Sequence, residues 1–377
     1  MKKIDQNNNV PIGRRKKFLF TVVLVLLNLF VFAVLYFGSI VWRSASYYGK
    51  HKRWSGSVYR FDKNYGYFPK PYELAYHSLE YGEQVPVIFD KNGFRIPYGE
   101  EKKHDKSSES QILFLGGSYT HGYGVPAEKT FAYLTASGLG AAAMNAGGSG
   151  WGLSQMVIRA RDVIPILKPD IVVVQYSNWL AERSLTFYIP TNLGKPSFPY
   201  FYETEGRVNI HPPLFQSINF KLPVSEFADK GYFTFFGHVV IPLLVYDDYP
   251  VASTLIKHQL GLLMPPIKSR QKAVDFAYKE IQELCDANGA NMVILVIPRT
   301  INDNPKDRLD AFSSHVVHTL EPLIEKLSEP TQEVWSESYR FWRGNPPKMV
   351  DTHPNTHMHA AIAEILIGAI KQIELKN

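Results

Sequence analysis

A serine at the end of a predicted strand is the first residue of this sequence that could do chemistry. Ser118 lies in "LFLGGSYTHGYGV" (113–125), where an apolar run leads into a glycine-rich bend. Such a bend suits a phosphate cradle, a mount for a nucleophile or a simple tight turn. A phosphate cradle needs a Lys-Ser or Lys-Thr after the glycines, or a Gly-x-Gly-x-x-Gly order with a downstream acid, and the stretch has neither. A tight turn and a nucleophile at Ser118 remain, and the nucleophile requires a base and an oxyanion site elsewhere in the chain.

The base is predicted close to the C-terminus. Asp351 and His353 lie in "VDTHPNTHMHAAIAEILIGAI" (350–370), in a loop just before an amphipathic helical pattern. A histidine placed there could take the proton of Ser118 while the aspartate fixes its tautomer and stabilises the imidazolium. An Asp-x-His before a helix can also be only a capping turn. The chain order, with the serine early and the Asp-His pair last, favours the catalytic interpretation.

Two further histidines follow on the same helix. We expect His357 and His359 to be surface residues and not ligands, because no acid stands at metal-ligand spacing from them. The sequence therefore predicts neither a metal site nor a cofactor.

Donors for an oxyanion are predicted at two other strand ends. The stretch "MNAGGSGWGLSQ" (144–155) holds Gly147, Gly148 and Gly150, which let backbone amides approach a ligand closely, although a tight turn needs a glycine too. Asn178 follows a third strand in "VVVQYSNWLAER" (172–183). Its side-chain amide could donate to the same oxyanion, or the residue could be a helix N-cap or part of a turn.

The elements that must position these residues alternate between apolar strands and helical patterns. The runs at 112–115, 141–145, 171–176 and 291–298 lack strict alternation and are separated by helix-length segments. This pattern predicts a parallel sheet covered on both faces, hence an α/β fold with flavodoxin-like winding. In such a sheet the loops after the strands meet at one crevice, which is where an open parallel sheet binds ligands.

The composition of the 377 residues excludes some other functions. The net charge is +6, but the first 17 residues hold six basic residues and one acid, so the remaining chain is almost neutral and no nucleic-acid partner is predicted. Cys285 is the only cysteine, which excludes an internal disulfide and a zinc site built from cysteines.

An apolar segment predicts a membrane anchor. Residues 18–41, "FLFTVVLVLLNLFVFAVLYFGSIV", would form about 36 Å of helix, enough to cross a bilayer. A signal peptide cleaved near "SAS" (44–46) is the alternative, but its apolar region would be too long. The basic residues 14–17 favour a cytoplasmic tail (1–17) and a catalytic part outside the cytoplasm, although four basic residues between 43 and 53 weaken the asymmetry.

The rest of the chain divides into three predicted segments. Residues 42–110 form an extended lead-in with a hairpin closed by Asn92-Gly93, a dipeptide that tolerates positive φ at both turn positions, and end in an exposed linker from Glu100 to Gln111. Residues 111–377 form the main domain. An irregular insertion at about 186–270 interrupts it and is expected to form a subdomain or cap, in which 238–245 is core or, as the alternative, interfacial.

In these motifs and their order the chain resembles the SGNH hydrolases, also called GDSL-like lipases and esterases. Ser118 in "FLGGSYTHGYGV" matches the nucleophile of the first block, with Gly117 where the family carries aspartate. Gly150 matches the oxyanion glycine of the second block and Asn178 the asparagine of the third, although Ser177 and Trp179 depart from that block. "DTHPN" matches the last block, with the aspartate two residues before the histidine instead of three.

The resemblance covers about residues 111–180 and 271–372 and implies the SGNH hydrolase fold with metal-free, serine-dependent ester chemistry. It implies Ser118, His353 and Asp351 as catalytic residues, with Gly150 and Asn178 stabilising the oxyanion. The lead-in motifs "NYGYFPKP" and "NGFR" are similar to those of membrane-anchored members associated with envelope polysaccharides.

The hypothesis that follows is an outward-facing, membrane-anchored esterase or deacylase that acts on acyl groups of a cell-envelope glycan or lipid. An O-acyltransferase on the same fold and a non-catalytic binding or assembly protein remain as alternatives.

Overall fold

The computed structural model describes residues 13–50, 54–55, 58–79, 84–100, 110–187, 197–214, 257, 260–309, 311–312 and 315–374. The chain divides into two compact units, Met1–Lys50 and His51–Asn377. The predicted tail (1–17) lies outside the described residues up to position 12, and the predicted linker lies outside them at 101–109.

From residue 13 onward, where the first unit is described, it consists of the helix α1 (Arg14–Lys50), about 55 Å long. Its segment Lys16–Tyr36 has a mean hydropathy of 2.9, and its apolar side chains from Phe18 to Leu35 are largely exposed. The polar groups of Thr21 and Asn28 donate to backbone carbonyls one turn earlier, which satisfies them without water. The helix is therefore a candidate membrane span or signal anchor, and "SAS" lies within it.

In its described residues the second unit is built on a nine-stranded mixed sheet, and the parallel strands of this sheet follow the predicted flavodoxin-like order. Its five parallel strands lie side by side in the order β8-β7-β9-β12-β13. This is the 2-1-3-4-5 order of a flavodoxin-like sheet, so the predicted winding is confirmed. The strands are β7 (Gln111–Leu115), β8 (Ala142–Asn145), β9 (Ile171–Tyr176), β12 (Asn291–Val296) and β13 (His315–His318).

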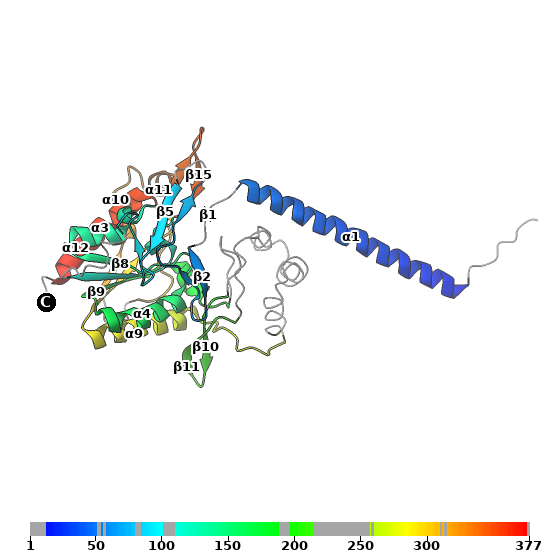
Figure 1. Cartoon of the computed structure of the whole chain (residues 1–377), viewed down its shortest axis with the longest axis horizontal. Coiled ribbons are helices and arrows are strands. Elements are labelled where there is room, and N and C mark those ends of the chain that lie inside the picture. The colour runs from blue at the N-terminus through cyan, green and yellow to red at the C-terminus, as the bar shows by residue number, and fades with distance from the viewer. Residues whose placement is uncertain are drawn as a thin grey trace, which may run out of the picture. The chain divides into compact units, whose positions relative to one another are not determined.

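Helices cover both faces of this sheet, which gives three layers (Figure 1). On one face α3 packs against α12, and on the other α4 packs against α9. Alternate residues of β7 explain the unbroken apolar runs: Leu113 belongs to the core under α4 and α9, whereas Ile112 and Phe114 belong to the core under α3 and α12. The helices on the two faces are α3 (Phe131–Gly138), α10 (Leu320–Glu325), α11 (Gln332–Tyr339) and α12 (Thr356–Glu374), then α4 (Leu153–Leu167) and α9 (Arg270–Asn288).

The lead-in strands extend the sheet beyond β8 in antiparallel pairing. These strands are β1 (Trp54–Ser55), β4 (Ala75–Ser78), β5 (Gln84–Phe89) and β6 (Arg95–Ile96), and a separate hairpin joins β2 (Tyr59–Asp62) to β3 (Gly66–Pro69). The hairpin predicted at Asn92-Gly93 is confirmed between β5 and β6. Of the two turn residues only Gly93 has a positive φ, +76°, because Asp90 Oδ1 accepts hydrogen bonds from the amides of Asn92 and Phe94 and fixes the turn.

Short elements complete the second unit. They are α2 (Ser118–His121), the 3₁₀ turn η1 (Ala127–Lys129), α5 (Asn178–Arg183), the hairpin of β10 (Tyr200–Thr204) and β11 (Arg207–His211), and the hairpin of β14 (Phe341–Arg343) and β15 (Lys348–Asp351). The β10–β11 hairpin lies within the predicted insertion. Most of the insertion, with the apolar run at 238–245, lies outside the described residues.

Candidate active site

Ser118 lies at the start of α2, immediately after β7, as the sequence predicts. Gln175, on the neighbouring strand β9, holds this turn from below: its Oε1 accepts from the Gly117 amide at 3.0 Å and from the Thr120 hydroxyl at 2.8 Å. The serine is 4% exposed. A buried glutamine therefore fixes the backbone on both sides of the serine.

His353 and Asp351 meet Ser118 from the other end of the chain. His353 Nε2 lies 2.9 Å from Ser118 Oγ, and His353 Nδ1 lies 2.6 Å from Asp351 Oδ1. The same carboxylate oxygen accepts the backbone amide of His353 at 2.8 Å. The structure thus brings together the three residues that the sequence proposed as nucleophile, base and orienting acid.

The sequence predicts Asp351 in a loop, but in the structure it is the last residue of strand β15. Its partner strand β14 pairs with it through Phe341, and the side chain of Asp351 is 6% exposed. The hairpin therefore presents a buried carboxylate to a histidine only two residues later. The two-residue spacing works because one carboxylate oxygen binds both the amide and the ring of His353.

Aromatic rings hold the imidazole in place. The rings of Tyr119 and Tyr123 contact His353 at centroid distances of 5.6 and 4.6 Å. With Nδ1 bonded to the carboxylate, Nε2 can accept the hydroxyl hydrogen of Ser118. The geometry can therefore transfer a proton from the serine to the histidine while the aspartate stabilises the imidazolium.

Gly150 lies in the loop after β8, which packs against the serine turn. Gly148 donates its amide to the Gly116 carbonyl at 3.0 Å, and a Cβ at Gly147 would lie 2.4 Å from the His121 nitrogen, so only glycine allows this approach. Gly150 has a φ of +81°. Within the described residues its amide donates to no protein acceptor, so it is available to a ligand.

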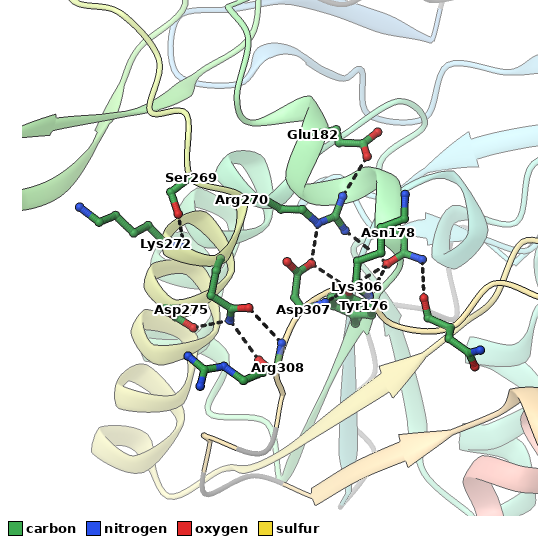
Figure 2. A network of polar contacts seen from close by, with 12 residues as sticks. Tyr176, Asn178, Glu182, Ser269, Arg270, Lys272, Asp275, Lys306, Asp307 and Arg308 are labelled. Atoms are coloured by element: carbon green, nitrogen blue, oxygen red, sulfur yellow. Dashed lines mark hydrogen bonds and ion pairs between the residues drawn. The ribbon is translucent and has the colours of Figure 1, made fainter.

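Asn178 is the first residue of α5, after β9, but its side chain serves another network (Figure 2). Nδ2 donates to Asp303 Oδ1 at 2.5 Å and to the Asn304 carbonyl at 2.9 Å. Oδ1 accepts from Tyr176 at 3.0 Å and from the Lys306 amide at 3.0 Å. Both amide hydrogens are thus used to hold the loop after β12, and this arrangement leaves none for an oxyanion at Ser118.

Arg270 closes this network from α9. Its Nε donates to Asp307 at 2.7 Å, one Nη lies 2.9 Å from Glu182, and the other reaches Asn178 Oδ1 at 3.3 Å (Figure 2). The network connects α5, α9 and the loop after β12. These contacts indicate that it supports the site structurally.

A buried arginine of the lead-in supports the serine turn and was missed by the sequence analysis. Arg95 on β6 is 0% exposed and donates to the carbonyls of His121, Gly122 and Val125 at 2.5–2.6 Å. Its only sequence signal is its place in "NGFR". The three carbonyls belong to the bend that follows Ser118, so the lead-in fixes the loop of this serine.

Arg183, in the last turn of α5, was also missed. Its Nη1 donates to the Trp151 carbonyl at 2.9 Å and lies 3.4 Å from where a Cβ of Gly117 would be. The guanidinium thus lies between the residue before the serine and the loop that carries Gly150. No sequence pattern marks an arginine at a helix end for such a place.

His359 corrects an expectation. It is not a surface residue but is 0% exposed on α12, and its Nδ1 accepts the Phe131 amide at 3.1 Å. Burial lowers the pKa of His359 to about 3, so the ring is neutral. His357 is exposed, as expected, because it lies on the opposite side of the helix.

Two more neutral histidines, His77 and His121, lie beside the site. Both are fully buried, and burial holds the pKa of each well below its usual range. His77 Nδ1 accepts the Gly124 amide at 2.9 Å and its ring contacts that of Tyr123 at a tilt, and Tyr123 in turn contacts His353. These rings therefore pack behind His353 as uncharged groups.

Other reactive groups are few in the described part of the chain. No group of three or more His, Cys, Asp or Glu residues there could hold a metal ion. Burial raises the pKa of the Cys285 thiol to about 12, so this thiol stays protonated and unreactive at neutral pH.

No protein-family model and no curated protein sequence matches the chain. The solved structures that match include many GDSL-like lipases and esterases. A carbohydrate esterase family 2 enzyme from Corynascus thermopiles (Myceliophthora fergusii) is 14% identical, with 77% of this chain and 71% of that chain covered and a TM-score of 0.32. A GDSL-like lipase from Bacteroides thetaiotaomicron is 12% identical (74% and 96% covered, TM-score 0.33), and the esterase EstA from Pseudoalteromonas sp. is 13% identical (71% and 100% covered, TM-score 0.33).

Proposed function

We propose that the protein is a serine-dependent esterase or deacylase of the SGNH type, with Ser118 as nucleophile, His353 as general base and acid, and Asp351 as the orienting carboxylate. One observation carries the proposal, the unbroken hydrogen-bond chain from Ser118 Oγ through the His353 ring to Asp351. Three side chains separated by up to 235 positions meet at 2.9 and 2.6 Å in the order that acyl transfer needs.

The reaction proceeds in two halves. Ser118 Oγ attacks the ester carbonyl while its proton moves to His353 Nε2, and the resulting oxyanion is stabilised by backbone amides, among which we place that of Gly150. The alcohol then leaves with the proton from His353, and an acyl-serine remains. Water, deprotonated by the same histidine, attacks the acyl-serine and releases the acid and the free enzyme.

Asn178, the other predicted oxyanion donor, takes part only if its amide leaves Asp303 and Asn304. The contacts of Nδ2 favour a stabilisation of the oxyanion by the protein backbone without this side chain.

An active-site serine probe tests the catalytic proposal. A fluorophosphonate should label the full-length protein in detergent micelles, and the variant Ser118→Ala should not be labelled. Equal labelling of both proteins would refute the proposed nucleophile. The non-catalytic alternative predicts no labelling of either, and the short distance from Ser118 to His353 argues against it.

We further propose that α1 anchors the protein and that the catalytic unit acts outside the cytoplasm on acyl groups of an envelope glycan or lipid. The exposed apolar side chains of α1 and the basic residues at its start support this orientation. A reporter enzyme that is active only outside the cytoplasm should work when fused to the C-terminus. Activity of a cytoplasm-restricted reporter at that end would refute the orientation.

The acyl-serine is also the first intermediate of an O-acyltransferase, in which a sugar hydroxyl replaces water. Acetate released from an acetylated glycan, measured with and without an acceptor saccharide, separates the two. We expect hydrolysis to dominate, and transfer that exceeds hydrolysis would replace esterase by transferase.

A further inference from the structure

We propose that Arg183, assisted by Arg299, forms an anion-binding subsite beside Ser118 that selects ester substrates whose sugar carries a carboxylate, such as an O-acylated acidic glycan. This inference rests on the proposed function, because it assigns the substrate class of the same site.

The place of Arg183 is the first argument. The guanidinium lies against Gly117, the residue before the nucleophile, and is held there by the carbonyl of Trp151, the residue after Gly150. It therefore lies between the two loops that surround the proposed oxyanion. A carboxylate bound to it would belong to the same molecule as the ester that Ser118 attacks.

The lack of an internal counter-charge is the second argument. Within the described residues no carboxylate forms an ion pair with Arg183, and its one hydrogen bond uses a single N–H of the five that a guanidinium offers. Its sequence neighbour Glu182 is directed to Arg270 instead. Burial lowers the pKa of Arg183, and the nearby Glu182 carboxylate offsets this effect only in part.

Gly117 is the third argument, because it has no side chain that could occupy the N–H donors of Arg183. An added Cβ would lie 2.9 Å from Leu180 Cδ2, 3.3 Å from the Trp151 carbonyl and 3.4 Å from Arg183 Nη1. An aspartate here, as in the resembling family, would place a carboxylate next to the guanidinium and neutralise it from within. With glycine, the unused donors can bind a carboxylate of the substrate with paired hydrogen bonds.

Arg299 adds a second positive charge to the same region. It follows β12, is exposed, and its charge acts on both Arg183 and Tyr119, the residue after the nucleophile. Asp303 binds the backbone amide of Arg299 and the side chain of Asn178, and no ion pair of the Arg299 side chain exists within the described residues. Within the described residues neither arginine forms an ion pair, and this positive charge near Ser118 favours an anionic substrate over a neutral one.

The test compares two matched sugars. One is the methyl glycoside of O-acetylated galacturonic acid, and the other is the corresponding O-acetylated galactoside, which lacks the carboxylate. Acetate release by the full-length protein in detergent micelles gives kcat and KM for each. We expect a higher kcat/KM for the galacturonate. Arg183→Gln should reduce this preference by about tenfold to a hundredfold, mainly through KM, because the paired hydrogen bonds between the charged groups are lost.

Three variants complete the design. Arg183→Lys keeps the charge but lacks the paired donors of a guanidinium, and it should retain part of the preference for the galacturonate. Arg299→Gln, at an exposed position that should tolerate change, should reduce it by a smaller factor. Arg161→Gln is the matched control, because Arg161 is an exposed arginine that pairs with Glu280 between α4 and α9, and the preference should not change.

The outcomes separate the two proposals. If fluorophosphonate does not label the wild-type protein, the proposed function is refuted. Labelling without a preference for the galacturonate, or a preference that survives Arg183→Gln, overturns the subsite and leaves the serine chemistry standing. An equal fall of kcat for both sugars in Arg183→Gln also overturns it, because the arginine would then stabilise the oxyanion and not the substrate's carboxylate.

Discussion

The buried histidine His359 makes the stability of the protein depend on pH in a way that can be isolated. The pKa of His359 is lowered to about 3 in the folded chain by burial and has an ordinary value of 6.5. Below pH 6.5 His359 takes up a proton in the unfolded chain but stays neutral in the folded chain. The stabilisation that comes from the neutral ring is therefore complete above pH 6.5 and is lost as the pH falls towards 3.

The size of the effect follows from the two pKa values. Between pH 7 and pH 5 this one histidine lowers the free energy of unfolding by about 2 kcal/mol, and each further pH unit down to the folded pKa removes about 1.4 kcal/mol more. His77 and His121 act in the same direction, since burial also lowers the pKa of each. Their contribution is the same in any variant at position 359.

The variant His359→Asn removes the titrating group and keeps an acceptor for the Phe131 amide, which His359 Nδ1 now accepts at 3.1 Å. We expect the difference in unfolding free energy between pH 7 and pH 5 to shrink by about 2 kcal/mol relative to the wild type. Urea unfolding of the full-length protein in nonionic micelles, followed by tryptophan fluorescence, measures this difference. The loss of ring volume lowers the stability at both pH values and so cancels.

His357→Asn is the matched control, because His357 lies two residues earlier on the same helix and is exposed. Its pH dependence should equal that of the wild type. If His359→Asn keeps the full wild-type difference between pH 7 and pH 5, the buried ring is not the group that titrates on unfolding, and the reasoning from burial fails.

Three further substitutions test the site and its support. Asp351→Asn should lower kcat for ester hydrolysis on the order of a thousandfold or more with little change in KM, because the wrong histidine tautomer is then held; a loss below tenfold would contradict the role of this carboxylate. Arg95→Met leaves the buried carbonyls of His121 and Val125 without a donor, since only that of Gly122 keeps one, the Val125 amide, and should lower the unfolding free energy by at least ~2 kcal/mol in urea titrations, whereas Arg60→Met, at an exposed position, should change it by less than ~0.5 kcal/mol. Asn178→Ala should lower stability and reduce kcat by less than the ~100-fold expected for a lost oxyanion donor; a larger fall in kcat at unchanged stability would show that its amide turns to the substrate.

The sequence could predict the parts of the fold that depend on local patterns. Apolar runs without alternation at 112–115, 171–176 and 291–298 predict a sheet buried on both faces, and Leu113 and Phe114 do face opposite cores. The predicted C-terminal helix also matches α12 (Thr356–Glu374). The β14–β15 hairpin could not be predicted in the same way, because its strands are short and partly exposed.

The site shows the same division between local and distant information. The position of a residue in its own element could be predicted for Ser118 and Asn178, since each follows a strand end. The partner of a side chain could not, because it depends on which distant loop folds over it. Asn178 meets Asp303 and Asn304, which are 125 and 126 positions away. The surface position expected for His359 is wrong for a similar reason, since α3, which comes from far along the chain, packs on α12 and covers this ring with Phe131.

Gly117 and Arg183 illustrate how a departure from a family pattern acquires meaning only in three dimensions. In the sequence, a glycine before the nucleophile reads as the loss of a family residue, and an arginine 66 positions later has no apparent relation to it. In the structure the guanidinium lies 3.4 Å from the place of the missing Cβ and has no carboxylate partner within the described residues. An arginine without an ion pair beside the residue that precedes Ser118 is the feature that our proposal explains by an anion arriving with the substrate, and it gives the glycine at 117 a role that the sequence alone does not reveal.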